Sequence, residues 1–243
     1  MRGEVVALGR EVLAPQSVEP LLGHLVQQGR DYQRGYASHM PDLAVRTADR
    51  DDHTEITAVL GRAFQVEPVY HWLFPDPAVR ARRVGPLIGT MLRHLHRRIG
   101  VTEVAMVDGA IVGAAVWDRP GTVGPPDWRI AFALPGMLRA MGRELPRLVR
   151  LGEVMERARP AEPHWYLSHL GADPERQRSG VGSALLRSML PRCDADGTPA
   201  YLECSDANVG YYERFGFAVR DTVVVDETLS CRAMWRIPGP SPA

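Results

Sequence analysis

The sequence predicts a mixed α/β domain, in which helices flank a central mixed sheet, from three observations. Segments typical of strands and of helices alternate along the chain, and strand-like segments are most frequent at both ends of this pattern. Residues 102–117 (TEVAMVDGAIVGAAVW) contain two apolar runs joined at Asp108-Gly109, a dipeptide typical of the type I′ turn of a β-hairpin. Two helical patterns, at about 129–141 and 144–157, follow this hairpin. We therefore expect a helical insert between the third and fourth strands.

Shorter patterns define the remaining elements. Strands are predicted at 43–47 (LAVRT), 164–172 (HWYLSHLGA), 199–204 (PAYLEC), 217–225 (FAVRDTVVV) and 229–237 (LSCRAMWRI). Helices are predicted at 48–64, at about 78–99, from 179 onward and within 206–216, with an aromatic loop at 67–77 and a Pro/Gly-rich linker at 119–128. Because proline lacks an N–H group, Pro191 should kink or end the helix that begins at 179.

The first part of the chain differs from the rest in pattern. Residues 1–39 contain one amphipathic piece and are otherwise turn-rich, whereas a compact pattern begins at Met40. We expect 1–39 to be a poorly ordered N-terminal extension, 40–238 to form the domain, and 239–243 to be a short tail.

Composition restricts the classes of partner. The chain has 243 residues with 29 basic and 29 acidic side chains, so its formal net charge of +0 does not favour nucleic acid or a membrane surface. No apolar run approaches the roughly 20 residues that a membrane-spanning helix needs, and the N-terminus lacks a signal-peptide pattern. Three cysteines without CxxC spacing favour neither a disulfide framework nor a zinc site. We expect a cytoplasmic protein that holds no metal ion.

The stretch DPERQRSGVGSALLRSML (173–190) carries the main functional signal. Its two glycines stand directly before an amphipathic helix, where backbone N–H groups and the helix dipole favour a phosphate. A dinucleotide-binding turn needs a third glycine or alanine, but Leu185 stands at that position. All 29 basic residues are arginine, which excludes the lysine-dependent P-loop, kinase and pyridoxal sites. The alternative is a purely structural role, in which the two glycines only allow the helix start to pack closely against its neighbours.

This stretch resembles the acyl-CoA site of the GCN5-related N-acetyltransferase (GNAT) superfamily. The family motif Gln/Arg-x-x-Gly-x-Gly/Ala is matched by QRSGVG (177–182). A second segment, AYLECSDANVGYYERFGF (200–217), is similar to the family's fifth strand, its asparagine and its helix-to-strand turn. Within the family, 159–175 and 201–217 look closest to puromycin N-acetyltransferase and its relatives. The resemblance covers about 43–238 and implies the GNAT fold.

The resemblance also implies acetyl-CoA as co-substrate. N–H groups from about 178–183 would meet the pyrophosphate, and the pantetheine arm would extend along the strand end at 170–172. Arg178 stands where the family commonly has glycine, so a left-handed backbone there would cost about 1 kcal/mol. The residues expected to bind the co-substrate are Leu170, Gly171, Ala172, Gln177, Arg178, Ser179, Gly180, Val181, Gly182, Ser183, Asn208 and Tyr212.

Two of these residues would also take part in the chemistry. By resemblance, the Ala172 N–H is the donor for the oxyanion, and Tyr212 matches the tyrosine that protonates or hydrogen-bonds the departing sulfur. One of the two adjacent rings, Tyr211 or Tyr212, should point into the core, and we favour Tyr212 as the catalytic one. Asn208 matches the asparagine that hydrogen-bonds CoA, although a helix N-cap role fits equally well.

Glu203 is the candidate catalytic base. Strand alternation places it on one face with Tyr201, whereas Cys204 lies on the opposite face. A glutamate in mid-strand is costly to bury without a partner or a role, and pairing with an arginine is the structural alternative. Because Cys204 lies on the other face, we expect direct acetyl transfer in a ternary complex.

The acceptor amine is expected between the first two helices, where relatives line the amine site. The candidate residues are Glu67, Tyr70, His71 and Trp72. Trp72 fits simple core packing equally well, and the helical insert would cover the same cleft. His94 and His96 are two residues apart and cannot share a helix face, so a metal site there is not expected.

The expected activity is therefore acetyl-CoA-dependent N-acetylation of a small-molecule amine, with antibiotics as one candidate class. A peptide or protein Nα-acetyltransferase, which would need an open groove, is one alternative. A non-catalytic acyl-CoA sensor, which would not need Tyr212 or Glu203, is the other. We expect a monomer or homodimer without nucleic-acid or membrane partners.

Overall fold

The computed structural model describes residues 43–96, 100–121 and 127–240, and residues 42–243 form one compact unit. The extension expected at 1–39 lies outside the described residues, as does most of the short C-terminal tail. None of the helices in the described ranges has the length and apolar content needed to cross a membrane.

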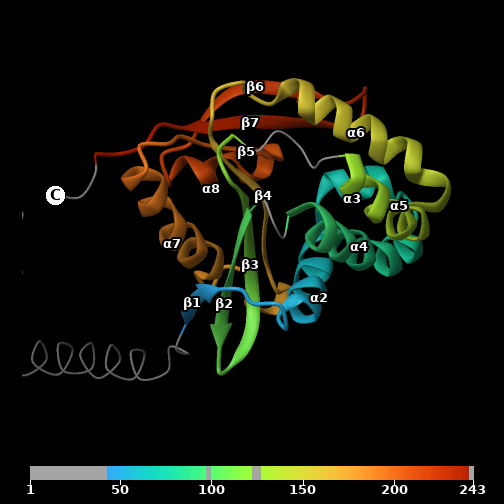
Figure 1. The fold of residues 1–243 in the computed structure, drawn as a ribbon, viewed down its shortest axis with the longest axis horizontal. Helices are drawn as coiled ribbons and strands as arrows, with labels where there is room; N and C mark the ends of the chain where they lie inside the picture. The colour runs from blue at the N-terminus through green and yellow to red at the C-terminus, as the bar shows by residue number, and fades with distance from the viewer. Residues whose placement is uncertain (1–42, 97–99, 122–126, 241–243) are drawn as a thin grey trace, which may run out of the picture. The chain divides into compact units, whose positions relative to one another are not determined.

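A single seven-stranded mixed sheet forms the centre of the domain (Figure 1), which confirms the predicted fold class. Its strand order is β1-β2-β3-β4-β5-β7-β6, and only the β4–β5 pair is parallel. The strands are β1 (Ala44–Thr47), β2 (Gly100–Val107), β3 (Ala110–Asp118), β4 (Trp165–Ala172), β5 (Ala200–Cys204), β6 (Ala218–Val224) and β7 (Ser230–Arg236). Asp108 (φ 51°) and Gly109 (φ 80°) both adopt positive φ, as the type I′ turn between β2 and β3 requires.

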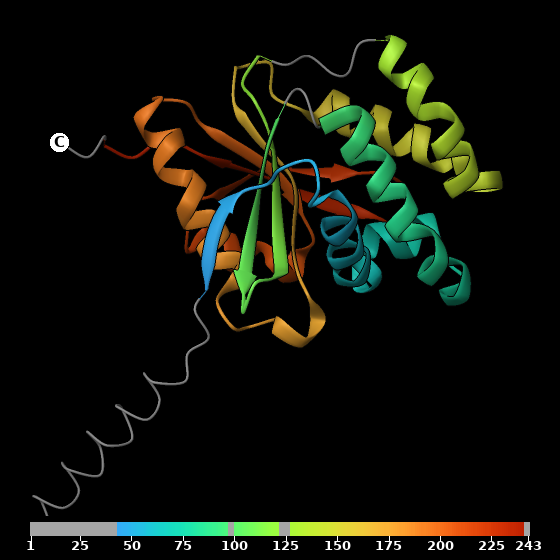
Figure 2. The same ribbon diagram turned by 60° about the horizontal axis from the view of Figure 1, so that its bottom comes forward.

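Helices cover both faces of this sheet, each over its own apolar core (Figures 1 and 2). On one face lie α2 (His53–Ala63), α3 (Pro68–Leu73), α4 (Pro77–Met91), α5 (Asp127–Met141) and α6 (Leu145–Ala158). On the other face lie α7 (Val181–Ala195) and α8 (Val209–Glu213). Short turns of other helix types include a π-helical turn at Leu92–His96, directly after α4. The helical insert between β3 and β4 is confirmed as α5 and α6.

Three local predictions were wrong. The first helix begins at His53 instead of 48, because Asp52 accepts hydrogen bonds from Arg46 and the Asp49 N–H and holds 48–52 in a turn. The aromatic loop contains α3, which begins at Pro68, a residue that suits a first helical position. At Pro191, where a kink or an end of the helix was predicted, only the predicted end was wrong: α7 continues to Ala195, since Leu190 and Cys193 extend its buried face.

Two irregularities of β4 shape the interior. The parallel β4–β5 ladder contains only Trp165–Ala200 and Tyr166–Tyr201, so the two strands separate beyond these pairs. On its other side, β4 pairs with β3 through a bulge, since Val116 pairs with His169 and Trp117 with Leu167. Ser168 is thus an extra residue. The bulge points the side chains of both Ser168 and His169 to the side of the sheet covered by α2–α6, where both line a cavity.

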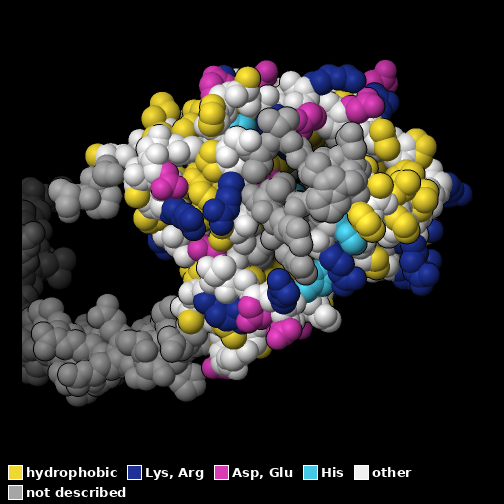
Figure 3. All heavy atoms as spheres, in the orientation of Figure 1, with side chains coloured by type: hydrophobic (Ala, Val, Ile, Leu, Met, Phe, Trp, Pro, Cys, Tyr) yellow, Lys and Arg dark blue, Asp and Glu magenta, His cyan; other side chains and the backbone are white. Residues whose placement is uncertain are grey.

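The surface carries charges of both signs, with hydrophobic side chains gathered over α5 in Figure 3. Ile130, Leu134 and Leu138 of this helix are each more than 40% exposed. The insert therefore has one apolar side toward the cavity and core and further apolar side chains toward solvent.

Candidate active site

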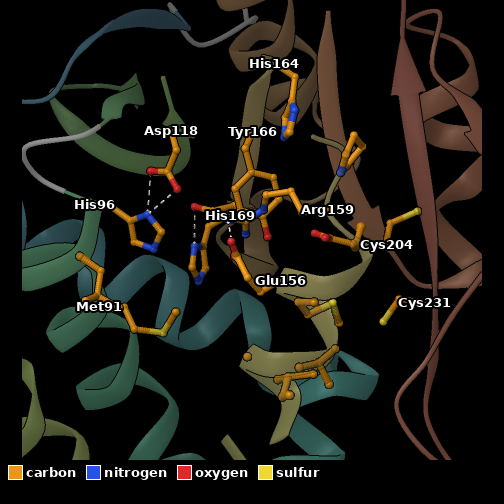
Figure 4. Close-up of a pocket in the computed structure, with 18 of the residues that line it drawn as sticks. Met91, His96, Asp118, Glu156, Arg159, His164, Tyr166, His169, Cys204 and Cys231 are labelled. Carbon is orange, nitrogen blue, oxygen red and sulfur yellow. Dashed lines mark hydrogen bonds and ion pairs between the residues drawn. The ribbon is translucent and has the colours of Figure 1, made fainter. Parts of the chain in front are cut away.

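A cavity of about 940 Å³ lies beneath the insert, on the side of the sheet covered by α2–α6. Its floor consists of the ends of β3, β4, β5 and β7, and its walls consist of α3, the end of α4, α5 and α6. Figure 4 shows polar side chains that converge on this space from several elements. Apolar lining from Leu148, Leu151 and Met155 makes the α6 wall hydrophobic.

The turn before α7 has the backbone shape that a phosphate site needs. Arg178 (φ 63°) and Gly180 (φ 90°) are both left-handed, and α7 begins at Val181 with Gly180 as its N-cap. Left-handed residues in a turn direct neighbouring backbone N–H groups to one side, and the first turn of any helix has N–H groups without intrahelical partners. Residues 174–180 are exposed, so this turn is open to a ligand.

The C-terminal end of β4 provides a backbone donor at the strand separation. The Asp173 N–H donates to the Val112 carbonyl on β3 (2.8 Å). Because N–H groups alternate in direction along a strand, the Ala172 N–H points away from β3, toward the gap between β4 and β5. The Leu170 N–H, two residues earlier on the same strand, points in the same direction. Gly171 approaches α2 closely: a Cβ there would come within 3.0 Å of both Leu60 and Ala63.

Tyr211 and Tyr212 on α8 point in different directions. Tyr212 is 9% exposed, packs in the α7–α8 core and contacts Phe217 edge to face (5.9 Å between centroids). Burial, followed by the neighbouring Cys204 thiol, raises the pKa of Tyr212 above its ordinary value. The Tyr211 hydroxyl lies instead against the turn, where a Cβ on Gly182 would approach it to 2.7 Å. That hydroxyl is buried without a hydrogen-bond partner among the described residues.

Glu203 on β5 faces the cavity, in line with the predicted alternation. Its Oε1 is buried and has no hydrogen-bond partner among the described side chains and backbone. Burial raises the pKa of the Glu203 carboxyl, and the nearby Tyr166 hydroxyl and Arg159 guanidinium oppose this rise in part. Arg159 stacks on the Tyr166 ring at 4.2 Å and is bonded to Glu156 at 3.0 Å.

The expected acceptor residues divide into two groups. Glu67 and Tyr70 line the cavity, and the Asn208 side chain donates to Glu67 Oε1 at 3.4 Å, which links α3 to the start of α8. His71 is exposed and contacts the Gln65 carbonyl, whereas Trp72 donates to Asp226 at 2.7 Å. The structure thus brings Glu67 and Tyr70, but not His71 or Trp72, to the cavity wall. Asn208 is the N-cap residue of α8 but makes no side-chain cap bond.

Four cavity residues were not singled out from the sequence: His96, Asp118, Ser168 and His169. His96 was considered only as half of a metal pair with His94, and Asp118 was not considered, because it lies between the predicted hairpin (102–117) and the predicted linker (119–128). The His96 Nδ1 lies 2.8 Å from Asp118 Oδ1, and the His169 Nε2 lies 3.5 Å from the Tyr70 hydroxyl. A polar residue at the end of an apolar strand was the available signal for Asp118.

The gap between β4 and β5 lies between the turn before α7, on one side of the sheet, and the cavity, on the other side. Glu67 and Cys204 line the cavity and also lie near Tyr212. A mixed sheet that opens between a helix N-terminus on one side and a cavity on the other suits an elongated ligand that passes through the sheet.

The comparisons with known proteins give the family. Residues 66–217, more than half of the chain, match the model of the acetyltransferase (GNAT) family, and the chain belongs to this family. It is 24% identical over 194 residues to an uncharacterised N-acetyltransferase of Schizosaccharomyces pombe, with 74% of this chain and 76% of the relative covered. The expected family and fold are thereby confirmed.

Solved structures agree on the fold. The chain is similar to a structure described as histone acetyltransferase HPA2 and related acetyltransferase from Corynebacterium glutamicum, at 26% identity and a TM-score of 0.64. That match covers 83% of this chain and 99% of the other. A polyamine N-acetyltransferase of Drosophila melanogaster has a TM-score of 0.52 at 17% identity, with 81% and 100% of the two chains covered, and shows the fold alone. The closeness to the puromycin-acetylating group stays a prediction.

Proposed function

We propose that this protein transfers an acetyl group from acetyl-CoA directly to the amine of a small molecule. The observation that carries the proposal is the β4–β5 separation, which joins an exposed, glycine-containing helix start to an internal cavity. A long, thin substrate with an anionic end and a reactive thioester end fits such an arrangement. The turn takes the pyrophosphate, and the gap takes the pantetheine arm.

Two groups beside the gap between β4 and β5 suit the thioester, one for its carbonyl oxygen and one for its sulfur. The amine nitrogen attacks the acetyl carbonyl carbon, the carbonyl oxygen becomes an oxyanion, and the Ala172 N–H donates to it. The C–S bond then breaks, and the electron pair leaves with sulfur. Because its pKa is raised, the Tyr212 hydroxyl stays protonated and serves as a hydrogen-bond donor to the departing thiolate. Glutamine, arginine and serine side chains at 177–179 and 183 surround the pyrophosphate.

Direct transfer is favoured over a covalent acetyl-enzyme. Burial raises the pKa of the Cys204 thiol to about 12, so little of the reactive thiolate form is present at neutral pH. Cys231, which also lines the cavity, has its pKa raised to about 11 by burial. Both thiols are therefore poor nucleophiles, and a ternary complex needs neither.

The cavity favours a small acceptor with an apolar body and an amino group. The α6 wall is hydrophobic, whereas Glu67 and Glu203 put carboxyl groups on the α3 and β5 sides. Burial raises the pKa of both carboxyl groups, which brings them nearer to the range of an amine base. The insert contributes one wall of the cavity, in contrast to the open groove that the Nα-acetyltransferase alternative would need. Antibiotic amines such as puromycin are one candidate class.

Thiol release from acetyl-CoA across a panel of amines tests this function. The panel contains puromycin, polyamines, arylalkylamines, amino acids and short peptides with free N-termini. Saturable thiol release with a small amine, and acetylation of that amine by mass spectrometry, is the expected result. Release only with peptides would support the Nα-acetyltransferase, and acetyl-CoA binding without release for every amine would support the sensor.

A further inference from the structure

His96 and Asp118 form a hydrogen-bonded pair in the cavity wall, and the second imidazole nitrogen of His96 has no hydrogen-bond partner among the described residues. His96 is 8% exposed and Asp118 is 8% exposed, and the two Asp118 oxygens lie 2.8 Å and 3.2 Å from His96 Nδ1. Because an ionised carboxylate can only accept, this contact places the ring proton of neutral His96 on Nδ1. The remaining nitrogen, Nε2, then has a free lone pair. It is buried and has no hydrogen-bond partner among the described residues.

The fold places this pair beside the irregular part of β4. His96 belongs to the π-helical turn at the end of α4, and Asp118 is the last residue of β3. The His96 ring contacts the His169 ring edge to face at 5.6 Å, and His169 stands next to the β4 bulge. Figure 4 shows the two imidazoles next to each other, with dashed lines that join the Asp118 carboxylate to His96.

We propose that His96 is the base that takes the proton from the acceptor amine, and that Asp118 is the positioning residue that fixes its tautomer. This inference rests on the proposed acetyl transfer. An ammonium acceptor gives one proton to His96 Nε2, and its freed lone pair attacks the thioester carbon. As the C–N bond forms and the C–S bond breaks, a second proton reaches the sulfur. The products are the N-acetyl amine, CoA thiol and a proton that His96 returns to solvent.

The surroundings favour His96 over the other cavity groups. The titratable groups that face it are Asp118 from β3 and His169 from β4, while Tyr70 from α3 reaches His169, and Arg119 and Glu156 line the same cavity further out. Burial, followed by the nearby His96, lowers the pKa of His169 to about 3, so His169 stays neutral and contributes no charge. Glu203, the base expected from the sequence, has the Arg159 guanidinium beside it, which repels an incoming ammonium.

His96→Asn is the decisive variant, because the asparagine amide nitrogen can keep the donor to Asp118 while Nε2 is removed. The proposal predicts that kcat/KM falls by about 100-fold or more at pH 7, within the range of general-base effects. The deficit should shrink to a few-fold above the pKa of the acceptor amine, where the neutral amine needs no base. Acetyl-CoA affinity, measured by calorimetry, should stay unchanged. Asp118→Asn should lose about 10-fold, with a changed ring tautomer in histidine ¹⁵N NMR spectra.

Two variants complete the design. His53→Gln removes an imidazole that contacts the Gly89 carbonyl outside the cavity, and it should leave kcat/KM and its pH profile unchanged. Glu203→Gln should lower kcat/KM by a factor that does not vary with pH.

The outcomes separate this inference from the proposed function. A pH-independent deficit for His96→Asn, or a pH-dependent deficit that belongs to Glu203→Gln instead, overturns the role of His96 and leaves acetyl transfer intact. A wild-type protein that binds acetyl-CoA but acetylates no amine overturns both. An NMR spectrum with the wild-type His96 proton on Nε2 also overturns the inference, whatever the activity.

Discussion

Adjacent residues on α8 have separate tasks because a helix of a few residues points consecutive side chains in different directions. The Tyr212 ring is buried beside Cys204 and Phe217, on the path between the turn and the cavity. The Tyr211 hydroxyl lies at Gly182, in the first turn of α7. We therefore predict that the Tyr212 hydroxyl serves the thioester sulfur and that the Tyr211 hydroxyl serves the phosphate end of the co-substrate.

Tyr212→Phe tests this division. Removal of the donor to the leaving thiolate should lower kcat by about 10- to 100-fold, the range for loss of a hydrogen bond to a charged group. The acetyl-CoA dissociation constant should change less than about 2-fold. Steady-state thiol release and calorimetry give the two values.

Tyr211→Phe is the matched control. It should raise the KM for acetyl-CoA more than it lowers kcat, because the hydroxyl lies at the turn. Equal kcat values for Tyr212→Phe and the wild type would contradict the role of Tyr212.

At the scale of elements, the turn between β4 and α7 has a backbone shape that matters as much as its side chains. The sequence departs from the family pattern at Arg178, and the structure confirms that this position is left-handed at φ 63°. A side chain in that conformation is strained, whereas glycine is not. Arg178 therefore costs stability at this position, and we predict that its guanidinium contacts a phosphate of the co-substrate.

Arg178→Gly should raise the free energy of unfolding by about 0.5–1 kcal/mol, because relief of the strain exceeds the extra freedom that glycine gives the unfolded chain. Acetyl-CoA affinity should fall at the same time if the guanidinium contacts a phosphate. Urea unfolding and calorimetry measure the two quantities. Arg176→Gly, at the end of a short 3₁₀ turn without positive φ, should instead lower stability by about the same amount.

Elements whose sequence pattern lies within one short stretch of the chain could be predicted from the sequence. The hairpin at Asp108-Gly109 and the insert each depend on neighbouring residues, and both were predicted correctly. The glycine-containing turn before α7 is also present, although the helix begins at Val181 instead of 179, and its role in binding stays a prediction. The end of α7 was not predicted correctly. Proline locally disfavours a helix, but the buried packing of Leu190 and Cys193 outweighs the effect of Pro191. His96 and Asp118 stand 22 residues apart on a helix end and a strand end, so no local pattern could have paired them.

At the scale of the whole molecule, the insert is held over the cavity by contacts with distant segments. The Arg150 guanidinium donates to the Val225 carbonyl at 2.8 Å, beyond the end of β6, and Arg147 donates to the Trp72 carbonyl at 2.8 Å. Arg83 on α4 donates to the Met141 carbonyl at 2.7 Å. The cavity is therefore a property of the folded domain, since segments from all parts of 64–231 close it.

A domain that buries neutral histidines around such a cavity should lose stability in mild acid. Burial lowers the pKa of His169 to about 3 and also lowers that of His164, whereas an exposed histidine in the unfolded chain titrates near 6.5. Between pH 6.5 and 3 the unfolded state therefore binds more protons than the folded state, and the free energy of unfolding falls as pH falls. The contribution of His169 alone approaches about 1.4 kcal/mol per pH unit.

Urea unfolding of the wild type and of His169→Gln between pH 7.5 and 5 measures this slope, because the carboxyl groups of the two proteins are the same and their titration cancels in the comparison. The wild type should lose stability more steeply, by about 1 kcal/mol per pH unit. At pH 7.5 the histidine is neutral in both states, so the difference between the two proteins there reports packing alone. Parallel slopes would show that His169 takes up a proton in the folded protein as readily as in the unfolded chain.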